Sequence, residues 1–358
     1  MEQYLEAHGV DRRAFLRFCA GIAATLGLPA PFARKVAAAI GRDDRPAVIW
    51  LHLQECTGDT ESLLRASRPT VDELVLDYLS IDYHETIMAA AGHQAEEARR
   101  KTLETYRGRY IAVVEGAVPT ANGGAYGCIG GRSMVEVARE VCGNAAVTIC
   151  VGSCSAFGGI QAAAPNPTGA RGIMDLVPTA TVVNLPGCPV NTSNLTATIA
   201  HVLTFGSPPR LDRFKRPLFA YGKRIHDNCE RRGHFDAGQF VEAWGDEGHR
   251  KGWCLYKMGC KGPESFHNCP TVRWNDGLAW PVGAGHPCVG CSEPGFWDSM
   301  SPFYGRLPDV PGVGVEVTAT KVGLGLTAAT AGTLAVHALM KTAQLKSKNG
   351  GRENEGED

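Results

Sequence analysis

The sequence predicts an α/β fold: a parallel sheet with helices on both faces, then a loop-rich domain, then a C-terminal helix. Three observations predict it. Short apolar runs alternate with helical patterns from residue 46 to residue 207. The stretch 208–310 is rich in glycine and metal-ligand residues and contains few convincing strands. Near the C-terminus, the apolar run Val322–Met340 precedes a charged tail. The 358 residues are enough for two domains with separate cores.

Residues 1–45 have the pattern of an export signal. The twin arginines Arg12 and Arg13 are followed by a Phe-Leu pair and by a mildly apolar stretch from Cys19 to Leu28. Small residues from Ala37 to Ala39 offer a cleavage zone. The twin-arginine route exports folded proteins, so metal-binding thiolates would be loaded before they meet an oxidising compartment. An ordinary amphipathic helix is the alternative.

Five strands, with helices between them, are expected between residues 46 and 207. Their alternation favours a parallel sheet, in which ligand sites lie at the carboxyl ends of the strands. The expected strands are Ala47–Leu53, Leu74–Ile81, Tyr110–Ala117, Ala145–Val151 and Thr181–Leu185, and the expected helices are Ile87–Tyr106, Ser133–Val141 and Ser193–Thr204.

Three cysteines lie just after expected strands, where a parallel sheet places its ligand sites. Cys56 follows the first expected strand, Cys154 the fourth and Cys188 the fifth. We therefore expect three loops that are distant in sequence to meet at one edge of the sheet.

The second domain continues the series of metal ligands. With 13 cysteines the chain is cysteine-rich, but it is far too long to need disulfides, so metal binding is the better interpretation. A domain that buries little apolar surface also needs bound metal as a source of order. The candidate ligands are His226, Cys229, Cys254, Cys260, Cys269, Cys288 and Cys291.

Four cysteines lie outside these motifs. Cys19 lies in the signal region, while Cys142 and Cys150 fall in a helix pattern and a strand pattern, where cysteine behaves as a small buried hydrophobe. Cys128 lies in a loop that follows a strand, on the ligand-bearing edge, and is a candidate for an additional ligand.

The C-terminal run Val322–Met340 is predicted to be a membrane anchor. At roughly 1.5 Å per residue it is just long enough to cross a hydrocarbon core of about 30 Å. Its single titratable residue is His337. Basic residues from Lys341 to Arg352 follow, and a positive excess belongs on the cytoplasmic side. A buried core helix and a surface helix in an oligomer are the alternatives.

The ordered set of motifs resembles the small subunit of a nickel-iron hydrogenase, most closely the membrane-associated uptake type (group 1). The resemblance covers effectively the whole chain, and it rests on the order of the motifs because any single Cys-x-x-Cys would be weak. The motifs are Cys56-Thr-Gly-x, Gly152-Ser153-Cys154, Pro186-Gly187-Cys188-Pro189, His226-x-x-Cys229, Gly252-Trp253-Cys254, Gly259-Cys260-Lys261-Gly262-Pro263, Asn268-Cys269-Pro270 and Cys288-Val-Gly-Cys291.

The resemblance implies a domain plan and three iron-sulfur clusters. A flavodoxin-like domain, 46–207, would hold a proximal [4Fe-4S] cluster. A cluster domain, 208–310, would hold a medial [3Fe-4S] and a distal [4Fe-4S] cluster. A linker and anchor helix, 311–341, and a charged tail, 342–358, would follow, and the composition of Lys346–Asp358 favours disorder. The implied ligands are Cys56, Cys154, Cys188 and the residue at position 59, Asp59, for the proximal cluster; His226, Cys229, Cys254 and Cys260 for the distal cluster; and Cys269, Cys288 and Cys291 for the medial cluster, with a proline of the Trp280-Pro281 pair near the missing fourth ligand.

Asp59 stands where the family has a fourth cysteine. A carboxylate binds iron, so we expect Asp59 to be an oxygen ligand. The alternatives are that Asp59 caps a helix starting near Thr60, or that Cys128, Glu55 or water completes the cluster.

If the Asp59 carboxylate binds iron, it bears on how the cluster responds to O2. Oxidised iron is harder than reduced iron, so an exchangeable carboxylate would tune the proximal cluster and let it survive oxidation. Some relatives use two extra cysteines for this purpose, but Gly58 and Gly159 occupy the matching positions here.

The function implied by the resemblance is electron transfer in a heterodimeric hydrogenase that splits H2 into protons and electrons. The nickel-iron centre would lie on the partner large subunit, with no catalytic residue in this chain. Electrons would pass to a membrane cytochrome b or iron-sulfur acceptor, on the periplasmic side of the cytoplasmic membrane. The net charge of -1 gives no indication of a nucleic-acid partner. A hydrogen-sensing regulatory subunit, a quinone-reductase cluster module and a flavin domain are the alternatives.

Overall fold

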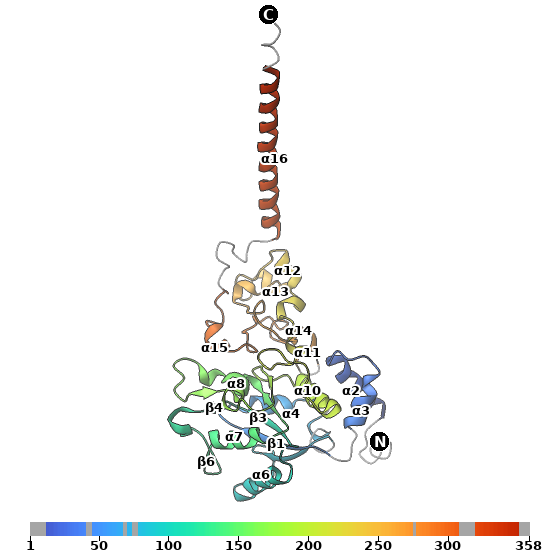
Figure 1. Cartoon of the computed structure of the whole chain (residues 1–358), viewed down its shortest axis with the longest axis vertical. Coiled ribbons are helices and arrows are strands. Elements are labelled where there is room, and N and C mark those ends of the chain that lie inside the picture. The colour runs from blue at the N-terminus through green and yellow to red at the C-terminus, as the bar shows by residue number, and fades with distance from the viewer. Residues whose placement is uncertain are drawn as a thin grey trace, which may run out of the picture.

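The computed structural model describes residues 12–40, 45–66, 70–73, 78–274, 277–307 and 319–350. These residues form a sheet lobe, a loop-rich lobe and a long C-terminal helix that extends away from both (Figure 1). The helices of the sheet lobe are α2 (Arg12–Thr25), α3 (Phe32–Ile40), α4 (Gly58–Leu64), α5 (Val71–Glu73), α6 (His93–Thr105), α7 (Met134–Gly143), α8 (Gly152–Phe157), α9 (Ile173–Leu176) and α10 (Thr192–Phe205), with short 3-10 turns η2 (Ala121–Gly124) and η3 (Ile160–Ala162).

Five parallel strands form the main sheet in the order β2-β1-β3-β7-β9. Their bounds are β1 (Ala47–His52), β2 (Ser80–His84), β3 (Ile111–Glu115), β7 (Val147–Val151) and β9 (Val182–Leu185). The strand order changes direction between β1 and β3, and a ligand crevice is expected at the carboxyl ends there. This is the flavodoxin-like order, so the predicted fold class is confirmed.

The predicted strands agree with four of these five within two residues at each end. The second differs, because β2 begins at Ser80 while residues 74–77 of the expected strand lie outside the described residues. Two small antiparallel pairs complete the lobe: β4 (Val118–Pro119) with β8 (Ala170–Arg171), and β5 (Cys128–Ile129) with β6 (Arg132–Ser133).

A separate apolar core covers each face of the sheet. Adjacent strand residues point to opposite faces, so Ile49 packs in one core with Ala112, while Trp50 packs in the other with Val113. Every residue of β1, β3, β7 and β9 is buried, because helices cover both faces. The expected burial of Cys142 and Cys150 is confirmed.

Residues 12–40, expected to act as an export signal, fold into α2 and α3. The two helices pack on each other and on α10. Phe15, Cys19 and Val36 are buried in the core on that side of the sheet. The described part of the signal region therefore has a hydrophobic face that fits the sheet lobe.

The loop-rich lobe has almost no sheet, as predicted: among its described residues, pairing between strands is limited to isolated bridges. Its order comes from short helices and two apolar clusters that include cysteines. The elements are α11 (Leu218–Tyr221), η4 (Ile225–Asn228), α12 (Arg232–Asp236), α13 (Glu247–Arg250), η5 (Tyr256–Met258), α14 (Cys269–Val272) and α15 (Phe296–Ser299).

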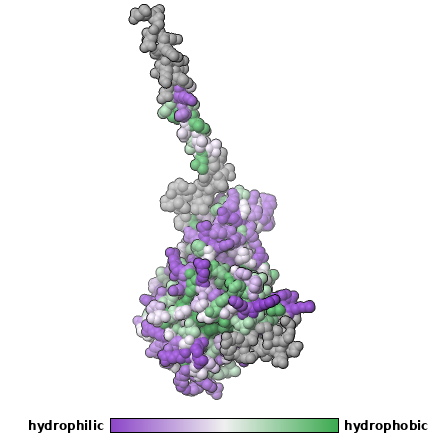
Figure 2. Space-filling model, turned by 45° about the vertical axis from the view of Figure 1, so that its right-hand side comes forward, coloured by the Kyte–Doolittle hydropathy of each residue, from purple (hydrophilic) through white to green (hydrophobic). Residues whose placement is uncertain are grey.

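The last element is α16 (Ala319–Gly350), whose side chains from 325 to 343 are all exposed. In Figure 2 green and white residues cover much of its coloured surface. Nevertheless, within the part of the chain that the structure describes, no helix combines the length and hydropathy of a membrane span. The predicted span at Val322–Met340 lies within α16, where glycine, threonine and His337 alternate with leucine, valine and alanine.

Candidate functional site

The three cysteines predicted at the sheet edge lie in loops that meet there. α8 begins directly after β7 and carries Cys154, while Cys188 follows β9. The amide of Ser153 donates to the carbonyl of Gly187 at 2.8 Å, which joins these two loops. Burial, together with the proximity of Asp59 and Cys56, raises the pKa of Cys154 to about 12. Burial likewise raises the pKa of Cys188 to about 12.

Asp59 is the fourth predicted ligand at this edge. It is only 7% exposed, and its Oδ1 accepts a hydrogen bond from the Val190 amide at 2.6 Å. Burial raises the pKa of Asp59 to about 7, and the Glu115 carboxylate adds to the rise. A carboxylate in this position needs a strong partner for its charge, and bound iron would provide one.

The alternative that Asp59 caps a helix is wrong. α4 begins at Gly58, and its N-cap is Thr57, whose side chain makes no capping bond. The Glu115 carboxylate accepts instead, from the Asp59 amide at 2.9 Å and from the Thr60 amide at 3.1 Å. The Thr60 hydroxyl also donates to it at 2.5 Å. A side chain at the end of β3 therefore caps α4, which leaves the Asp59 carboxylate available to the loops.

Gly152 makes room for Asp59. Its φ is 78°, in the region that favours glycine. A Cβ on Gly152 would lie 2.1 Å from Asp59 Oδ2. The glycine of the Gly152-Ser153-Cys154 motif thus has a steric reason as well as a conformational one.

Sequence reasoning missed a cluster of polar side chains near Asp59, formed by His52, Glu55, His84 and Glu115. His52 Nδ1 lies 3.3 Å from Glu55 Oε1 and 3.8 Å from Glu115 Oε2, and His52 Nε2 lies 3.3 Å from His84 Nδ1. Burial lowers the pKa of His84 to about 3, so this ring is neutral. The available signal was that β1, β2 and β3 each end in a titratable residue, at neighbouring positions of the sheet edge.

Cys128 lies elsewhere. It is exposed in the β5–β6 hairpin, where it pairs with Ser133. Among the described residues, no interaction joins its thiol to Cys56, Cys154 or Cys188. The structure therefore gives no support to Cys128 as a substitute ligand.

The predicted medial ligands surround a cavity of about 210 Å³ in the loop-rich lobe. Cys269, Cys288 and Cys291 line it, together with Trp280 and Pro281, the pair expected near the missing ligand. Burial raises the pKa of all three thiols above the usual range. The structure thus brings the three cysteines together around an apolar space.

The predicted distal ligands form the third group. Burial raises the pKa of Cys254 to about 12, and the nearby Cys260 and Cys229 contribute to the rise. The His226 amide donates to the Gly262 carbonyl at 3.2 Å, which ties η4 to the loop after Cys260. Burial and then Arg232 lower the pKa of His226, so its imidazole is available as a neutral ligand.

Contacts link the medial ligands to the distal ligands and to the sheet edge. The Cys288 amide donates to Cys260 Sγ at 3.4 Å, which connects the medial and distal groups. Cys291 and Cys188 are close enough to interact electrostatically, which connects the medial group to the sheet edge. We call this arrangement, from Cys188 through Cys291 and Cys288 to Cys260, the thiol row.

The chemistry of the donors fits iron-sulfur clusters. All 13 cysteines are free thiols. Thiols with pKa values near 12 keep their protons at neutral pH, and a bound metal replaces those protons because it stabilises the thiolate. Iron in sulfide clusters is bound best by such soft ligands, with imidazole as an accepted substitute.

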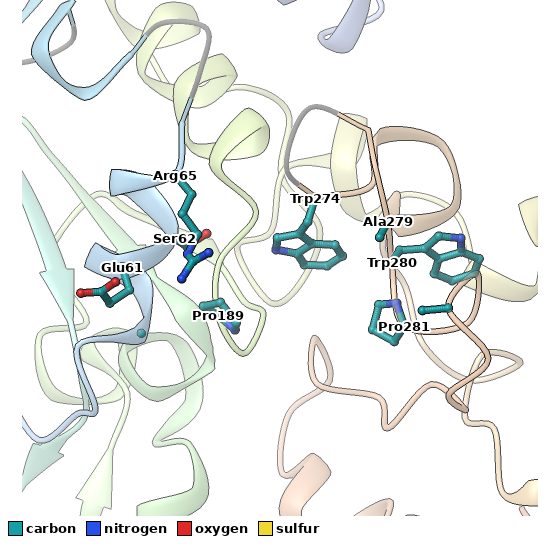
Figure 3. Close-up of a pocket in the computed structure, with 10 residues that line it drawn as sticks. Glu61, Ser62, Arg65, Pro189, Trp274, Ala279, Trp280 and Pro281 are labelled. Atoms are coloured by element: carbon teal, nitrogen blue, oxygen red, sulfur yellow. The ribbon is translucent and has the colours of Figure 1, made fainter. Parts of the chain in front are cut away.

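A pocket of about 530 Å³ opens beside the predicted ligands at the sheet edge. Figure 3 shows Ser62 of α4 and Arg65, the residue that follows α4, on one side of it, and Trp274 and Trp280 of the loop-rich lobe on the other. Gly58 and Pro189 also line it, so its floor adjoins the loops that carry Cys56 and Cys188.

Comparison with known proteins gives matches along nearly the whole chain. The family described as NADH ubiquinone oxidoreductase, 20 Kd subunit, matches residues 56–202, and the C-terminal family of the NiFe/NiFeSe hydrogenase small subunit matches residues 221–304. The quinone-reactive Ni/Fe-hydrogenase small chain of Wolinella succinogenes is 48% identical over 353 residues, which are 96% of this chain and 99% of that protein. The hydrogenase-2 small chain of Escherichia coli is 51% identical over 292 residues, 81% of this chain and 78% of that one.

A solved structure agrees with these relatives. The reduced, active Ni-Fe-Se hydrogenase from Desulfomicrobium baculatum contains a chain that is 36% identical, with a TM-score of 0.69, covering 74% of this chain and 100% of that one. The chain therefore belongs to the nickel-iron hydrogenase small subunits and is part of a hydrogen oxidoreductase.

Proposed function

We propose that this protein carries electrons away from a nickel-iron centre in its large-subunit partner through three iron-sulfur clusters. Cys56, Asp59, Cys154 and Cys188 would hold a proximal [4Fe-4S] cluster. Cys269, Cys288 and Cys291 would hold a medial [3Fe-4S] cluster, and His226, Cys229, Cys254 and Cys260 a distal [4Fe-4S] cluster. When bound, the clusters would supply one-electron carriers in sequence.

The thiol row is the observation that carries this proposal. Three groups of ligands from two lobes could lie anywhere on the molecule, yet Cys291 lies close to Cys188 and the Cys288 amide bonds to Cys260. A direct order from sheet edge to distal group is what stepwise transfer requires. The protein's part is to hold each site rigidly and to keep it away from water.

The large subunit would dock at the sheet edge. The pocket shown in Figure 3 is open, adjoins the loops of Cys56 and Cys188, and presents Trp274 and Arg65, residue types that are enriched at interfaces. Docking there would bring the partner's active site next to the proximal cluster, where electrons enter.

The distal end would face a membrane acceptor. The Wolinella succinogenes relative is named quinone-reactive, which favours a route to quinone through a cytochrome b or iron-sulfur protein. We propose that α16 attaches the protein at the membrane by packing on helices of that acceptor, since its glycine, alanine and threonine content suits close helix packing. Twin-arginine export would place the complex on the periplasmic side.

A Cys291→Ser variant of the heterodimer tests the relay. H2 cleavage occurs on the partner, so we expect hydrogen-deuterium isotope exchange to continue while reduction of an external acceptor falls at least about tenfold, because a step of the relay is damaged. Cys128→Ser, at an exposed cysteine outside the thiol row, is the matched control and should change neither rate. Unimpaired acceptor reduction in Cys291→Ser would refute the proposed route.

A further inference from the structure

His267 is a buried residue to which the proposed relay gives no role. It is 2% exposed and lines the medial cavity. Its ring is fixed between two aromatic side chains: it meets Tyr221 edge-on with ring centroids 4.9 Å apart, and it stacks on Trp274 at 5.7 Å with an interplanar angle of 13°. The orientation of both ring nitrogens is therefore set by packing.

The two nitrogens have very different surroundings. Nδ1 lies 2.9 Å from Cys269 Sγ, whereas Nε2 is buried without a hydrogen-bond partner among the described residues. A neutral imidazole carries one proton, on one of its two nitrogens, and the surroundings of the ring decide which.

We propose that His267 donates its Nδ1 proton to the sulfur of Cys269 and thereby raises the reduction potential of the medial cluster. The inference rests on the proposed function, because it requires Cys269 to ligate iron. An iron-bound thiolate has lost its own proton, so a hydrogen bond over this distance needs the proton on Nδ1. The opposite tautomer would point two lone pairs at each other and bury an N–H without an acceptor.

The direction of the effect follows from charge. Reduction adds negative charge to the cluster and its sulfur ligands, and a hydrogen bond to sulfur stabilises that charge. The apolar cavity around the pair screens the interaction weakly. His267 is thus a positioning and tuning residue that favours electron acceptance at the middle of the relay, and its imidazole is not an iron ligand.

Redox titration of the heterodimer, followed by electron paramagnetic resonance, tests this inference. For His267→Phe, which keeps an aromatic ring but removes the donor, we expect the equilibrium constant for reduction of the medial cluster to fall about tenfold, a shift of about 59 mV for one electron. His267→Asn places an amide donor near the position of Nδ1 and should restore most of the potential. The control is His286→Phe: this ring lines the same cavity, but its nitrogens contact the Pro287 carbonyl and the Tyr304 hydroxyl, so the potential should stay close to that of the unmodified protein.

The outcomes separate this inference from the proposed function. An intact medial cluster whose potential is unchanged in His267→Phe would overturn the hydrogen bond's role. So would an equal fall in His267→Asn, which would indicate packing instead of donation. Strong coupling of a directly bound nitrogen to the cluster, seen by pulsed resonance and lost in His267→Phe, would show the imidazole to be a ligand and would also overturn it. Absence of any cluster at Cys269, Cys288 and Cys291 in the unmodified protein would instead refute the proposed function.

Discussion

At the scale of single residues, Asp59 distinguishes the proximal site. It is buried near two other carboxyl groups, Glu55 and Glu115, and both raise its pKa in addition to burial. Capping is excluded as its role because Glu115 performs that task. Such a crowded carboxylate is costly unless its charge has a partner, which favours the interpretation of Asp59 as an iron ligand.

Replacing Asp59 tests its ligand role. We expect Asp59→Ala to lose iron and to change the proximal-cluster spectrum, because one iron loses its protein ligand. Asp59→Cys should keep the iron, since it supplies the thiolate usual in the family. Metal analysis and electron paramagnetic resonance measure both. An unchanged proximal cluster in Asp59→Ala would refute ligation, and full activity of Asp59→Cys under air would refute a role in oxygen resistance.

Gly152 and Gly131 form a matched pair that tests the space around Asp59. Their φ angles are 78° and 80°, so an alanine at either suffers similar backbone strain. A Cβ on Gly152 would meet Asp59 Oδ2, whereas a Cβ on Gly131 would meet nothing within 4 Å. We expect Gly152→Ala to reduce the free energy of unfolding by about 1–3 kcal/mol more than Gly131→Ala does, read from thermal unfolding. Equal losses would show that Asp59 moves aside freely.

At the scale of elements, the sheet was predictable and the cap of α4 was not. Period and composition locate β1, β3, β7 and β9 because a strand buried on both faces is a continuous apolar run. The cap depends on Glu115, 56 residues from Asp59, and no local pattern records such a contact. His267 and Cys269 are close in sequence, but the effect of their contact on the cluster's reduction potential depends on burial, which the sequence does not give.

The cap itself is testable by amide exchange. Glu115→Gln replaces a carboxylate that accepts two backbone amides and a hydroxyl by a group with one acceptor oxygen, so the start of α4 should open more readily, by about 1–3 kcal/mol. Faster hydrogen exchange in residues 57–64 would show this. Glu140→Gln is the control, because Glu140 is partly exposed and its surface ion pair with Arg132 contributes little. Identical exchange in both variants would contradict the cap.

At the scale of the whole molecule, the two ends and the thiol row imply a direction of electron transfer. The large subunit would bind at the sheet edge, and electrons would leave through the loop-rich lobe toward the end that carries α16 (Figure 1). The anchor at α16 stays a prediction: the helix is long enough to cross a membrane, but among the described residues no helix has the length and hydropathy of a span. The meeting of Cys154 and Cys188 at the sheet edge was predictable because each follows a strand, whereas the ligand groups of the loop-rich lobe were predicted only from the resemblance to the family.

Export is tested at this scale by changing the twin arginines. Arg12→Lys combined with Arg13→Lys should keep the complex in the cytoplasm with its iron bound, since the route recognises the pair and accepts folded cargo. Arg17→Lys, at an exposed arginine of the same helix, should leave export unchanged. Fractionation with an activity assay measures the distribution. Normal export of the double variant would contradict the predicted signal.

The central claim, a relay of three clusters in one chain, is tested most directly by metal analysis and redox-titrated electron paramagnetic resonance of the purified heterodimer. The account predicts nickel with the partner and, in this chain, iron for two [4Fe-4S] clusters and one [3Fe-4S] cluster, with the [3Fe-4S] signal lost in Cys291→Ser. Iron sufficient for only the sheet-edge cluster, with no [3Fe-4S] signal at any potential, would contradict it.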